Sequence, residues 1–444
     1  MTFDPTKKRV TVMGLGRFGG GVGVARWLAA QHADVLVTDL QPAEKLTDSI
    51  ASLDDLASAG RVTLRLGEHR ERDFTSCDAL VVNPAVPKPW DNPYIRAARE
   101  GGALVTTEIG LLVEQLAGSD EGRRRVIGVT GSAGKSTTAS MIAHALRALD
   151  HPVHLGGNIG GSLLESLDRI APADRVVLEL SSAMLHWLGN WSPGVAVVTN
   201  LSPNHLDWHG SLAHYTACKH SITAHQQPGD TAVLGASLTD WPTPQAGAPH
   251  RLAPHDRVEG LAVPGLHNAQ NAALARAAVD CLGITASRAQ IDDALRSFAG
   301  LPHRLCFLGK RKNVCYYDDS KSTTPQATLL ALDAFEARDG LARVHLIAGG
   351  YDKGSDLTPI AFRAGGLAGL YCIGATGRGL AAAAPANAHD CATLDSAMAQ
   401  IAARAQPGDI VLLSPGCASW DQFNNFEQRG RAFAALAGLP GSDL

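Results

Sequence analysis

The chain lacks the features that would place it in a membrane or on a nucleic acid. No apolar run approaches the roughly 20 residues that a membrane-spanning helix requires. Positive charge is not in excess, because 39 lysines and arginines stand against 43 acidic residues and leave a net charge of −4. Nucleic-acid binding needs a basic face. We therefore expect neither a membrane nor a nucleic acid as a partner.

The chain also lacks the cysteine patterns of disulfide frameworks and zinc sites. Its eight cysteines are scattered and include no C-x-x-C spacing, which is typical of reduced, mostly buried thiols in a cytoplasmic protein. Residues 1–9 are polar and lead into a strand, so we expect no signal peptide. Short repeats and low-complexity tracts are absent from the sequence as well. These features favour a cytoplasmic globular protein.

With 444 residues, the chain is too long for one hydrophobic core, and two or three domains are expected. Apolar strands alternate with helices throughout, which predicts an α/β protein. We expect a Rossmann-like N-terminal domain over 1–105 and a Rossmann-like C-terminal domain over 302–444. Between them, over 106–301, we expect a central P-loop-type domain with a mostly parallel sheet.

The most informative stretch is residues 131–138, GSAGKSTT. It follows an apolar strand expected at 126–129 and precedes a helix expected at 138–149. A glycine-rich turn followed by Lys-Ser at a helix start holds a polyphosphate, and the hydroxyl can reach Mg²⁺. Val129 stands where the general P-loop pattern has glycine. A loop of this composition can also cap an ordinary helix, but the flanking strand and helix favour nucleotide binding.

The N-terminal segment has a second glycine-rich turn, GLGRFG at 14–19. A strand at 10–13, a helix at 20–30 and a strand at 35–38 that ends at Asp39 complete a βαβ unit around it. This pattern is typical of dinucleotide-binding folds, where the acid bonds a ribose hydroxyl. The glycines could instead serve close helix packing alone. A strand at 79–82 opens onto the loop 83–87, at the sheet edge where ligands bind in such folds.

Polar residues follow the strands expected at 176–180 and 195–198, close to the phosphate loop. Glu179 lies in the first, and Thr199 and Asn200 follow the second. His205 comes next, and Lys219 lies on an expected helix. Taken singly, that histidine would be structural and that lysine solvated. We further expect loops and short strands over 226–264, an amphipathic helix over 266–282, and third-domain strands at 314–317, 344–348, 370–373 and 410–413.

Several motifs occur in a fixed order along the chain: GSAGKSTT at 131–138, GNIG at 157–160, ELSS at 179–182, TN at 199–200, HLD at 205–207, Lys219, HN at 267–268 with Asn271, HR at 303–304, DSK at 319–321 and DKG at 352–354. This set resembles the Mur ligases of peptidoglycan synthesis over essentially the full chain. Three stretches resemble the glutamate-adding member of that family: LPHR at 301–304, GGYDKG at 349–354 and LSPGCASWDQF at 413–423.

The resemblance implies an ATP-dependent ligase that adds D-glutamate to UDP-N-acetylmuramoyl-L-alanine through an acyl phosphate. It also implies a cytoplasmic, monomeric enzyme with two Mg²⁺ ions and a carbamylated Lys219. The implied catalytic residues are Lys135, Glu179, His205 and Lys219. The implied metal ligands are Ser136, Glu179, His205 and the carbamate of Lys219. The implied ATP contacts are Gly131, Gly134, Lys135, Ser136, Thr137, Asn268, Asn271, Arg304 and Asp319.

The resemblance also implies contacts for the other two substrates. UDP-muramoyl-alanine would be bound by Gly16, Arg17, Phe18, Asp39, Asn83, Asn158 and Ser181. Glutamate would be bound by Lys321, Thr323, Lys353, Ser419 and Phe426. Lysines facing a side-chain carboxylate suit an acidic amino acid.

Four features depart from the family pattern. Ala183-Met184 stands where these ligases tend to carry Phe-Gln, Asp318 and Thr324 replace two asparagines, Ser132-Ala133 replaces a pair such as Asn-Gly, and the first glycine-rich turn extends to Gly21. Four alternatives stay open on the sequence: a folylpolyglutamate synthase-like ligase, an L-glutamate ligase, a dinucleotide-dependent oxidoreductase, and a binding or scaffold protein with an inactive ligase site.

Overall fold

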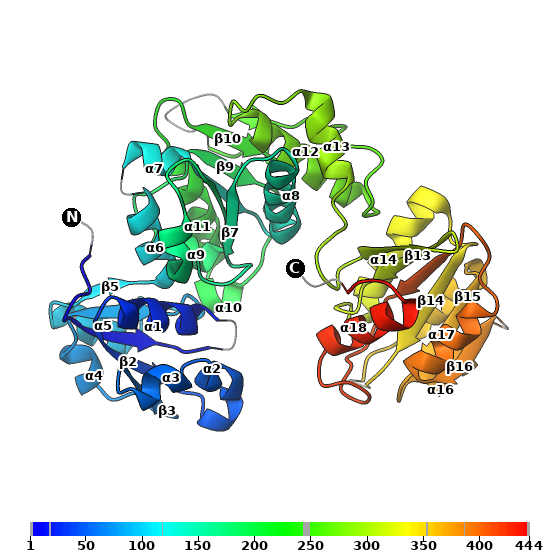
Figure 1. Ribbon diagram of the computed structural model, residues 1–444, viewed down its shortest axis with the longest axis horizontal. Coiled ribbons are helices and arrows are strands. Elements are labelled where there is room, and N and C mark those ends of the chain that lie inside the picture. Colours follow the sequence, from blue (N-terminus) through cyan, green and yellow to red (C-terminus); the bar gives the residue numbers. More distant parts are fainter. Residues whose placement is uncertain are drawn as a thin grey trace. The chain divides into compact units, whose positions relative to one another are not determined.

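The computed structural model describes residues 3–16, 19–117, 119–242, 249–351, 354–385 and 387–441. Three sheets with flanking helices follow one another along the chain (Figure 1). Within the described residues, all strand pairs but β12–β13 are parallel. Parallel neighbours need crossover connections, which helices mostly supply here. The expected α/β fold with three mostly parallel sheets is confirmed.

The first sheet has the strand order β3-β2-β1-β4-β5. Its strands are β1 (Arg9–Met13), β2 (Asp34–Asp39), β3 (Val62–Leu66), β4 (Ala79–Val82) and β5 (Leu104–Thr106). Its helices are α1 (Gly20–Ala30), η1 (Ala43–Lys45), α2 (Thr47–Ala51), α3 (Asp54–Ser58), α4 (Arg72–Thr75) and α5 (Pro93–Glu100). The direction of winding reverses between β1 and β4, and ligands bind at such a point in open α/β sheets.

The second sheet has the order β11-β10-β9-β6-β8-β7. Its strands are β6 (Val126–Thr130), β7 (Val153–Gly157), β8 (Arg175–Glu179), β9 (Val195–Val198), β10 (Thr231–Leu234) and β11 (His250–Arg251). Its helices are α6 (Glu108–Ala117), α7 (Asp120–Arg124), α8 (Lys135–Ala148), η2 (Leu164–Arg169), α9 (Ser182–Trp187), α10 (Leu206–His209), α11 (Leu212–Ala224), α12 (Leu266–Asp280) and α13 (Arg288–Arg296). The central strand β6 therefore places the loop after it between the ends of β8 and β9.

The third sheet has the order β12-β13-β17-β14-β15-β16, with β12 antiparallel at one edge. Its strands are β12 (Cys306–Arg311), β13 (Val314–Asp318), β14 (Val344–Gly349), β15 (Gly369–Ile373), β16 (Ala388–Ala392) and β17 (Ile410–Leu413). Its helices are α14 (Pro325–Asp339), α15 (Thr358–Arg363), η3 (Ala364–Gly366), α16 (Gly377–Ala383), α17 (Leu394–Ala402) and α18 (Phe426–Ala437). The expected strands at 314–317, 344–348, 370–373 and 410–413 correspond to β13, β14, β15 and β17.

Helix α12 corrects one prediction. The sequence suggested an amphipathic helix with one exposed face, but residues 271–279 are buried on every side. Five of these nine residues are alanines, whose small side chains let neighbouring segments approach from all directions. Asn271 and Arg276 lie in this buried stretch, at 7% and 6% exposure. These two polar residues made the helix look amphipathic in the sequence, although they are buried.

The described chain forms two compact units by internal contacts. One comprises Met1–Asp256 with Ala273–Ile291, and the other comprises Arg257–Ala272 with Asp292–Leu444. The first two sheets therefore belong to one unit. No helix among the described residues combines the length and the apolar character needed to cross a bilayer. The boundaries expected at 105/106 and 301/302 stay predictions.

The close approach of α1 to the first glycine-rich turn generates a stability prediction. A Cβ atom on Gly21 would lie 2.2 Å from the Leu15 carbonyl oxygen, a backbone atom that cannot move aside cheaply. Gly21→Ala should therefore destabilise the protein by about 1–3 kcal/mol, seen as a lower Tm in thermal unfolding followed by circular dichroism. The control is Gly379→Ala in α16, where no described heavy atom lies within 4 Å of the added Cβ. An unchanged Tm for Gly21→Ala would contradict this account of the turn.

Candidate active site

The phosphate loop connects β6 to α8 and is shaped by two glycines with positive φ. Gly131 has φ 148° and Gly134 has φ 80°, conformations that side chains rarely adopt. A Cβ on Gly131 would lie 1.9 Å from Thr199 Oγ1, so this position has room only for glycine. Helix α8 begins at Lys135, three residues before the expected start. Its first N–H groups, including those of Ser136 and Thr137, therefore belong to the loop and favour an anion.

The segment after β9 holds the loop in place. Asn200 accepts a hydrogen bond from the Ala133 N–H at 3.0 Å through its side chain, and donates to the Ala133 carbonyl at 3.0 Å. Thr199 Oγ1 donates to the same carbonyl at 2.5 Å, and the Asn200 carbonyl accepts from the Ser132 N–H. The prediction that Thr199 and Asn200 lie near the phosphate loop is confirmed. They fix its backbone before any ligand arrives.

Tyr215 contacts the phosphate loop, which was not predicted from the sequence. Its hydroxyl lies 2.7 Å from Ser132 Oγ, and the residue is 1% exposed on α11. Ser132 Oγ also contacts the Ser202 carbonyl at 2.8 Å. The loop is thus attached to α11 as well as to the end of β9. A lone tyrosine in an expected helix carried no signal for this role.

Lys219 lies beside the same loop and is not a solvated helix lysine. It is 1% exposed, and its Nζ donates to the Gly131 carbonyl at 2.9 Å and to Thr130 Oγ1 at 3.2 Å. Burial, followed by the positive charge of Lys135, lowers the pKa of Lys219 to about 7. Near neutral pH much of this amine is therefore uncharged and nucleophilic.

Glu179 ends β8 and supplies a carboxylate beside the loop strand. It is 1% exposed, and its Oε1 accepts from Asn158 Nδ2 at 2.9 Å. Among the described residues, its buried Oε2 has no hydrogen-bond donor. An unpartnered buried carboxylate oxygen is costly unless a cation or donor meets it. Hard oxygen donors such as this and the Ser136 hydroxyl fit Mg²⁺.

Two further residues of the central domain, His205 and Ser181, were predicted to belong to the site. His205 is exposed and takes the left-handed conformation, φ 51°, which is uncommon for a non-glycine residue. Its N–H donates to the side chain of Asn204 at 2.9 Å. Ser181 caps α9 by accepting from the Met184 N–H. The metal role of His205 and the substrate role of Ser181 stay predictions.

The first-domain residues meet at the point where the winding reverses. Asp39 accepts from the N–H of Gly16 at 3.1 Å and of Gln41 at 2.8 Å, so its carboxylate organises the turn. Asn83, in the loop after β4, donates from Nδ2 to the Gly14 carbonyl at 3.2 Å. The structure thus brings Gly16, Asp39 and Asn83 to one edge. Arg17 and Phe18 lie outside the described residues.

In the third domain, Asp319 is directed inward. It is 5% exposed and accepts from Ser322 Oγ at 2.5 Å, Ser414 Oγ at 2.7 Å and the Leu305 N–H at 3.0 Å. Burial raises the pKa of Asp319 to about 7, against the lowering effect of these hydrogen bonds. Its carboxylate therefore joins the loops after β13 and β17. Its predicted contact with a ribose is untested.

The predicted glutamate pocket is partly assembled within this domain. Lys321 is exposed, and its Nζ lies 5.1 Å from the centre of the Phe426 ring. Thr323 is half-buried and Ser419 is buried. Lys353 and the adjacent Asp352 lie outside the described residues. An ammonium and an aromatic ring attract each other in this arrangement.

Sequence reasoning also missed the residue that holds this pocket's backbone. Arg429, 1% exposed on α18, donates to Ser320 Oγ and to the carbonyls of Ser320, Cys417 and Ala418. It thereby ties the Ser320 loop to the Cys417 loop. Its place three residues after Phe426 is the one available sequence signal.

The departure at Asp318 has a physical reason in the structure. Asp318 Oδ2 lies 2.7 Å from Nδ1 of the buried His303, next to the exposed Arg304. A carboxylate accepts from a histidine nitrogen that carries a proton, and it adds a negative charge that an asparagine oxygen lacks. In α12, Asn268 donates from Nδ2 to the Pro264 carbonyl at 2.6 Å, and Asn271 is buried. The ATP contacts predicted for Arg304, Asn268 and Asn271 are untested.

Comparison with known proteins assigns all three parts of the chain to one family. Family models described as the Mur ligase MurD-like N-terminal domain, the Mur ligase middle domain and the Mur ligase glutamate ligase domain match residues 8–107, 129–243 and 303–417. Among solved structures, UDP-N-acetylmuramate–alanine ligase MurC and an ADP complex of MurF ligase, both from Thermotoga maritima, are similar in fold. Each has a TM-score of 0.55. The first shares 19% identity over 97% of this chain and 99% of its own, and the second 17% over 98% and 100%.

Curated relatives agree with these models over nearly the full length. Proteins named UDP-N-acetylmuramoylalanine–D-glutamate ligase are 37% identical in Ruegeria pomeroyi, over 96% of this chain and 96% of the relative, and 36% identical in Roseiflexus, over 97% and 98%. A third, from Pelotomaculum thermopropionicum, is 35% identical over 98% of both chains. The chain belongs to the Mur ligase family, in the branch of the UDP-N-acetylmuramoylalanine–D-glutamate ligases.

Proposed function

We propose that this ligase phosphorylates the carboxylate of UDP-N-acetylmuramoyl-L-alanine with the γ-phosphate of ATP and then joins it to the amine of D-glutamate. A carboxylate is a poor electrophile, and the acyl phosphate makes phosphate the leaving group when the amine attacks. The observation that carries the proposal is the position of Lys219 Nζ, 2.9 Å from the Gly131 carbonyl of the phosphate loop. This lysine is buried beside a loop that Asn200 also holds.

The phosphate loop would stabilise the negative charge of the phosphates in both steps. The N–H groups at the start of α8 would bind the β- and γ-phosphates, Lys135 would offset their charge, and Gly131 and Gly134 would let the backbone approach them. The transferred group gathers negative charge, so positioned cations supply most of the rate enhancement. The prior fixation of the loop by Thr199 and Asn200 means that little reorganisation accompanies binding.

Magnesium would be held by the Ser136 hydroxyl, Oε2 of Glu179, His205 and the carbamate of Lys219. When bound, Mg²⁺ neutralises phosphate charge and orients the γ-phosphate. Asn158 donates to the other oxygen of Glu179 and so fixes the rotation of the carboxylate. Histidine is a less usual partner for Mg²⁺ than oxygen.

Carbamylation of Lys219 would complete this oxygen-rich set. The neutral amine attacks CO₂, a C–N bond forms, and one proton is released to leave a carbamate anion. The surroundings favour the reaction, because burial and Lys135 disfavour the ammonium. The product places a negative charge at the former amine, beside the proposed metal ligand Glu179.

Substrate contacts outside the central sheet follow the family assignment. Gly16, Arg17, Phe18, Asp39 and Asn83 would bind the UDP group, and Asn158 and Ser181 the muramoyl-alanine group. Asn268, Asn271, Arg304 and Asp319 would complete the ATP site, and Lys321, Thr323, Lys353, Ser419 and Phe426 the glutamate site. The domain division at 1–105, 106–301 and 302–444, a cytoplasmic location and a monomeric state belong to the same proposal.

The substrate assignment predicts a defined pattern of phosphate release. With ATP, Mg²⁺ and UDP-N-acetylmuramoyl-L-alanine, the purified protein should release phosphate when D-glutamate is added. L-Glutamate or a diamino acid should give none above background. Lys135→Ala should lower kcat by about 10²-fold or more, because a cation that meets developing charge is lost. Release with L-glutamate alone would overturn the stereochemistry, and release with none of the amino acids, in a folded sample, would overturn the activity.

Carbamylation predicts a carbon signal that depends on one lysine. In ¹³C-bicarbonate, the protein should give a carbamate ¹³C resonance of about one equivalent, and Lys219→Gln should abolish it. Lys310→Gln, a substitution on β12, is the matched control and should leave the resonance unchanged. A spectrum that is the same for wild type and Lys219→Gln would refute the modification.

The hydrogen bonds by which Thr199 and Asn200 hold the phosphate loop predict a graded effect on nucleotide binding. Thr199→Val removes the hydroxyl that donates to the Ala133 carbonyl and nearly conserves side-chain shape. It should weaken a non-hydrolysable ATP analogue by about 5–30-fold, the equivalent of about 1–2 kcal/mol. Thr199→Ser keeps the hydroxyl and should bind within about threefold of wild type, as measured by calorimetry. Equal affinities for the valine and serine variants would contradict a role of the Thr199 hydroxyl in holding the loop.

A further inference from the structure

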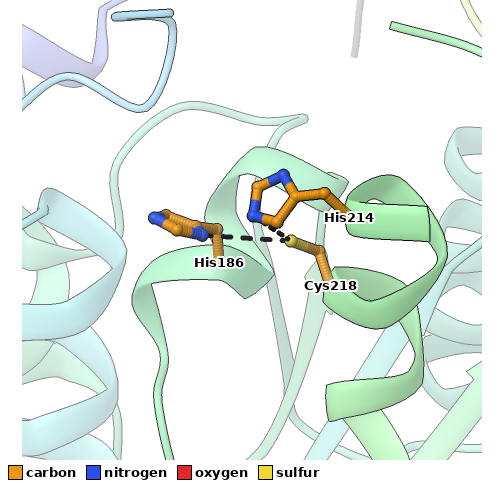
Figure 2. A group of neighbouring side chains, drawn as sticks. All are labelled: His186, His214 and Cys218. Carbon is orange, nitrogen blue, oxygen red and sulfur yellow. Dashed lines mark hydrogen bonds between the residues drawn. The ribbon is translucent and has the colours of Figure 1, made fainter. Parts of the chain in front are cut away.

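Outside the phosphate site, two helices bring together two imidazoles and a thiol. His186 lies on α9, and His214 and Cys218 lie one turn apart on α11 (Figure 2). His214 Nε2 is 3.5 Å from Cys218 Sγ, and His186 Nδ1 is 3.9 Å from the same sulfur. The three donor atoms lie within 4.8 Å of one another. One ring nitrogen of each histidine therefore faces the same sulfur.

The spacing of these three donor atoms fits a metal site as well as it fits weak hydrogen bonds to sulfur. A thiol can donate its single proton to one ring nitrogen and can accept only weakly from the N–H of the other. A tetrahedral zinc site places neighbouring nitrogen and sulfur ligands about 3.5 Å apart, given Zn–N near 2.0–2.1 Å and Zn–S near 2.3 Å. The His214–Cys218 contact matches this edge. His186 is half-buried near the end of α9, so a side-chain rotation can shorten its longer distance.

A second layer of contacts orients His214. Its Nδ1 lies 3.0 Å from His209 Nδ1, and His209 Nε2 lies 2.9 Å from Ser182 Oγ. One proton arrangement has His214 Nδ1–H donating to His209, whose Nε2–H donates to Ser182. That arrangement leaves the lone pair of His214 Nε2 directed at the Cys218 side, as metal-binding histidines require. The reverse arrangement would place a proton there, so a bound cation selects the first.

We propose that His186, His214 and Cys218 bind one Zn²⁺-class cation, with water in the fourth position. Imidazole and thiolate are ligands for borderline-soft ions such as Zn²⁺, whereas Mg²⁺ prefers oxygen. Both histidines are partly exposed to solvent, whereas Cys218 is buried. Binding breaks the S–H bond of Cys218, forms a metal–thiolate bond and releases one proton to solvent.

The cation would link two segments that carry the proposed catalytic groups. Helix α9 follows Glu179 directly, and Cys218 precedes Lys219 on α11. Trp90 from the first domain packs against His214, with ring centres 4.5 Å apart, and Trp208 donates from Nε1 to the Pro84 carbonyl. The site therefore lies where the loop after β4 meets α9, α10 and α11. A bound ion would fix these segments to one another.

Cobalt binding followed by absorption spectroscopy tests the site directly. With excess Mg²⁺ present to fill oxygen-rich sites, one equivalent of Co²⁺ should give the visible bands of a tetrahedral ion and a thiolate-to-cobalt charge-transfer band in the near ultraviolet. One equivalent of Zn²⁺ should remove both and raise Tm. Cys218→Ser should abolish the charge-transfer band, and His214→Gln should weaken binding at least about 10-fold.

Two controls separate this site from other thiols and from the proposed magnesium site. Cys315→Ser changes a half-buried thiol on β13 and should leave the spectrum intact. Glu179→Gln changes the proposed magnesium ligand and should also leave the charge-transfer band intact. The proposal is overturned if the wild type gives no thiolate band with one equivalent of Co²⁺, or if the band persists in Cys218→Ser. The absence of a band in the wild type overturns the proposal without any variant, and a band in the wild type is assigned to Cys218 by its loss in Cys218→Ser.

Discussion

The constraint on which the site depends is that the backbone between β6 and α8 must stay open toward an anion. Two positive-φ glycines give the loop its shape, but they would leave it mobile without support. Thr199 and Asn200 provide that support from the neighbouring strand end, through four hydrogen bonds to Ser132 and Ala133. Parallel strand order brings the two ends together, because β9 pairs directly with β6. The sheet topology is thus the cause of the preformed loop.

Around this loop, the protein retains groups that do not favour stability. Glu179 buries a carboxylate oxygen without a donor among the described residues, and Lys219 buries an amine whose pKa is lowered to about 7. Buried groups of this kind destabilise a fold unless a ligand or a chemical change satisfies them. Both groups lie beside the phosphate loop, one at the end of β8 and one on α11. The Mur ligase assignment and this local chemistry therefore point the same way.

Sequence reasoning succeeded where strands are fully buried and failed where context decides. Strands β6, β9 and β17 are buried along their whole length, so they read as uninterrupted apolar runs. The short or half-exposed strands β3, β5 and β16 gave no such run. The motif residues Lys135, Glu179 and Lys219 could be named in advance. The supporting contacts of Tyr215 and Arg429 could not, because they depend on which helix faces each loop. Asp319 was named from the sequence as an ATP contact, but its hydrogen bonds to two loops of the third domain were not predicted.

The central claim is that the substrate carboxylate is phosphorylated at this loop before the amide forms. The most direct measurement uses UDP-N-acetylmuramoyl-L-alanine labelled with ¹⁸O in its carboxylate, and determines the isotopic content of the released phosphate by mass spectrometry. When the amine displaces phosphate from the acyl phosphate, one carboxylate oxygen leaves with it. The account predicts one ¹⁸O atom per released phosphate, whereas amide formation with unlabelled phosphate would contradict it.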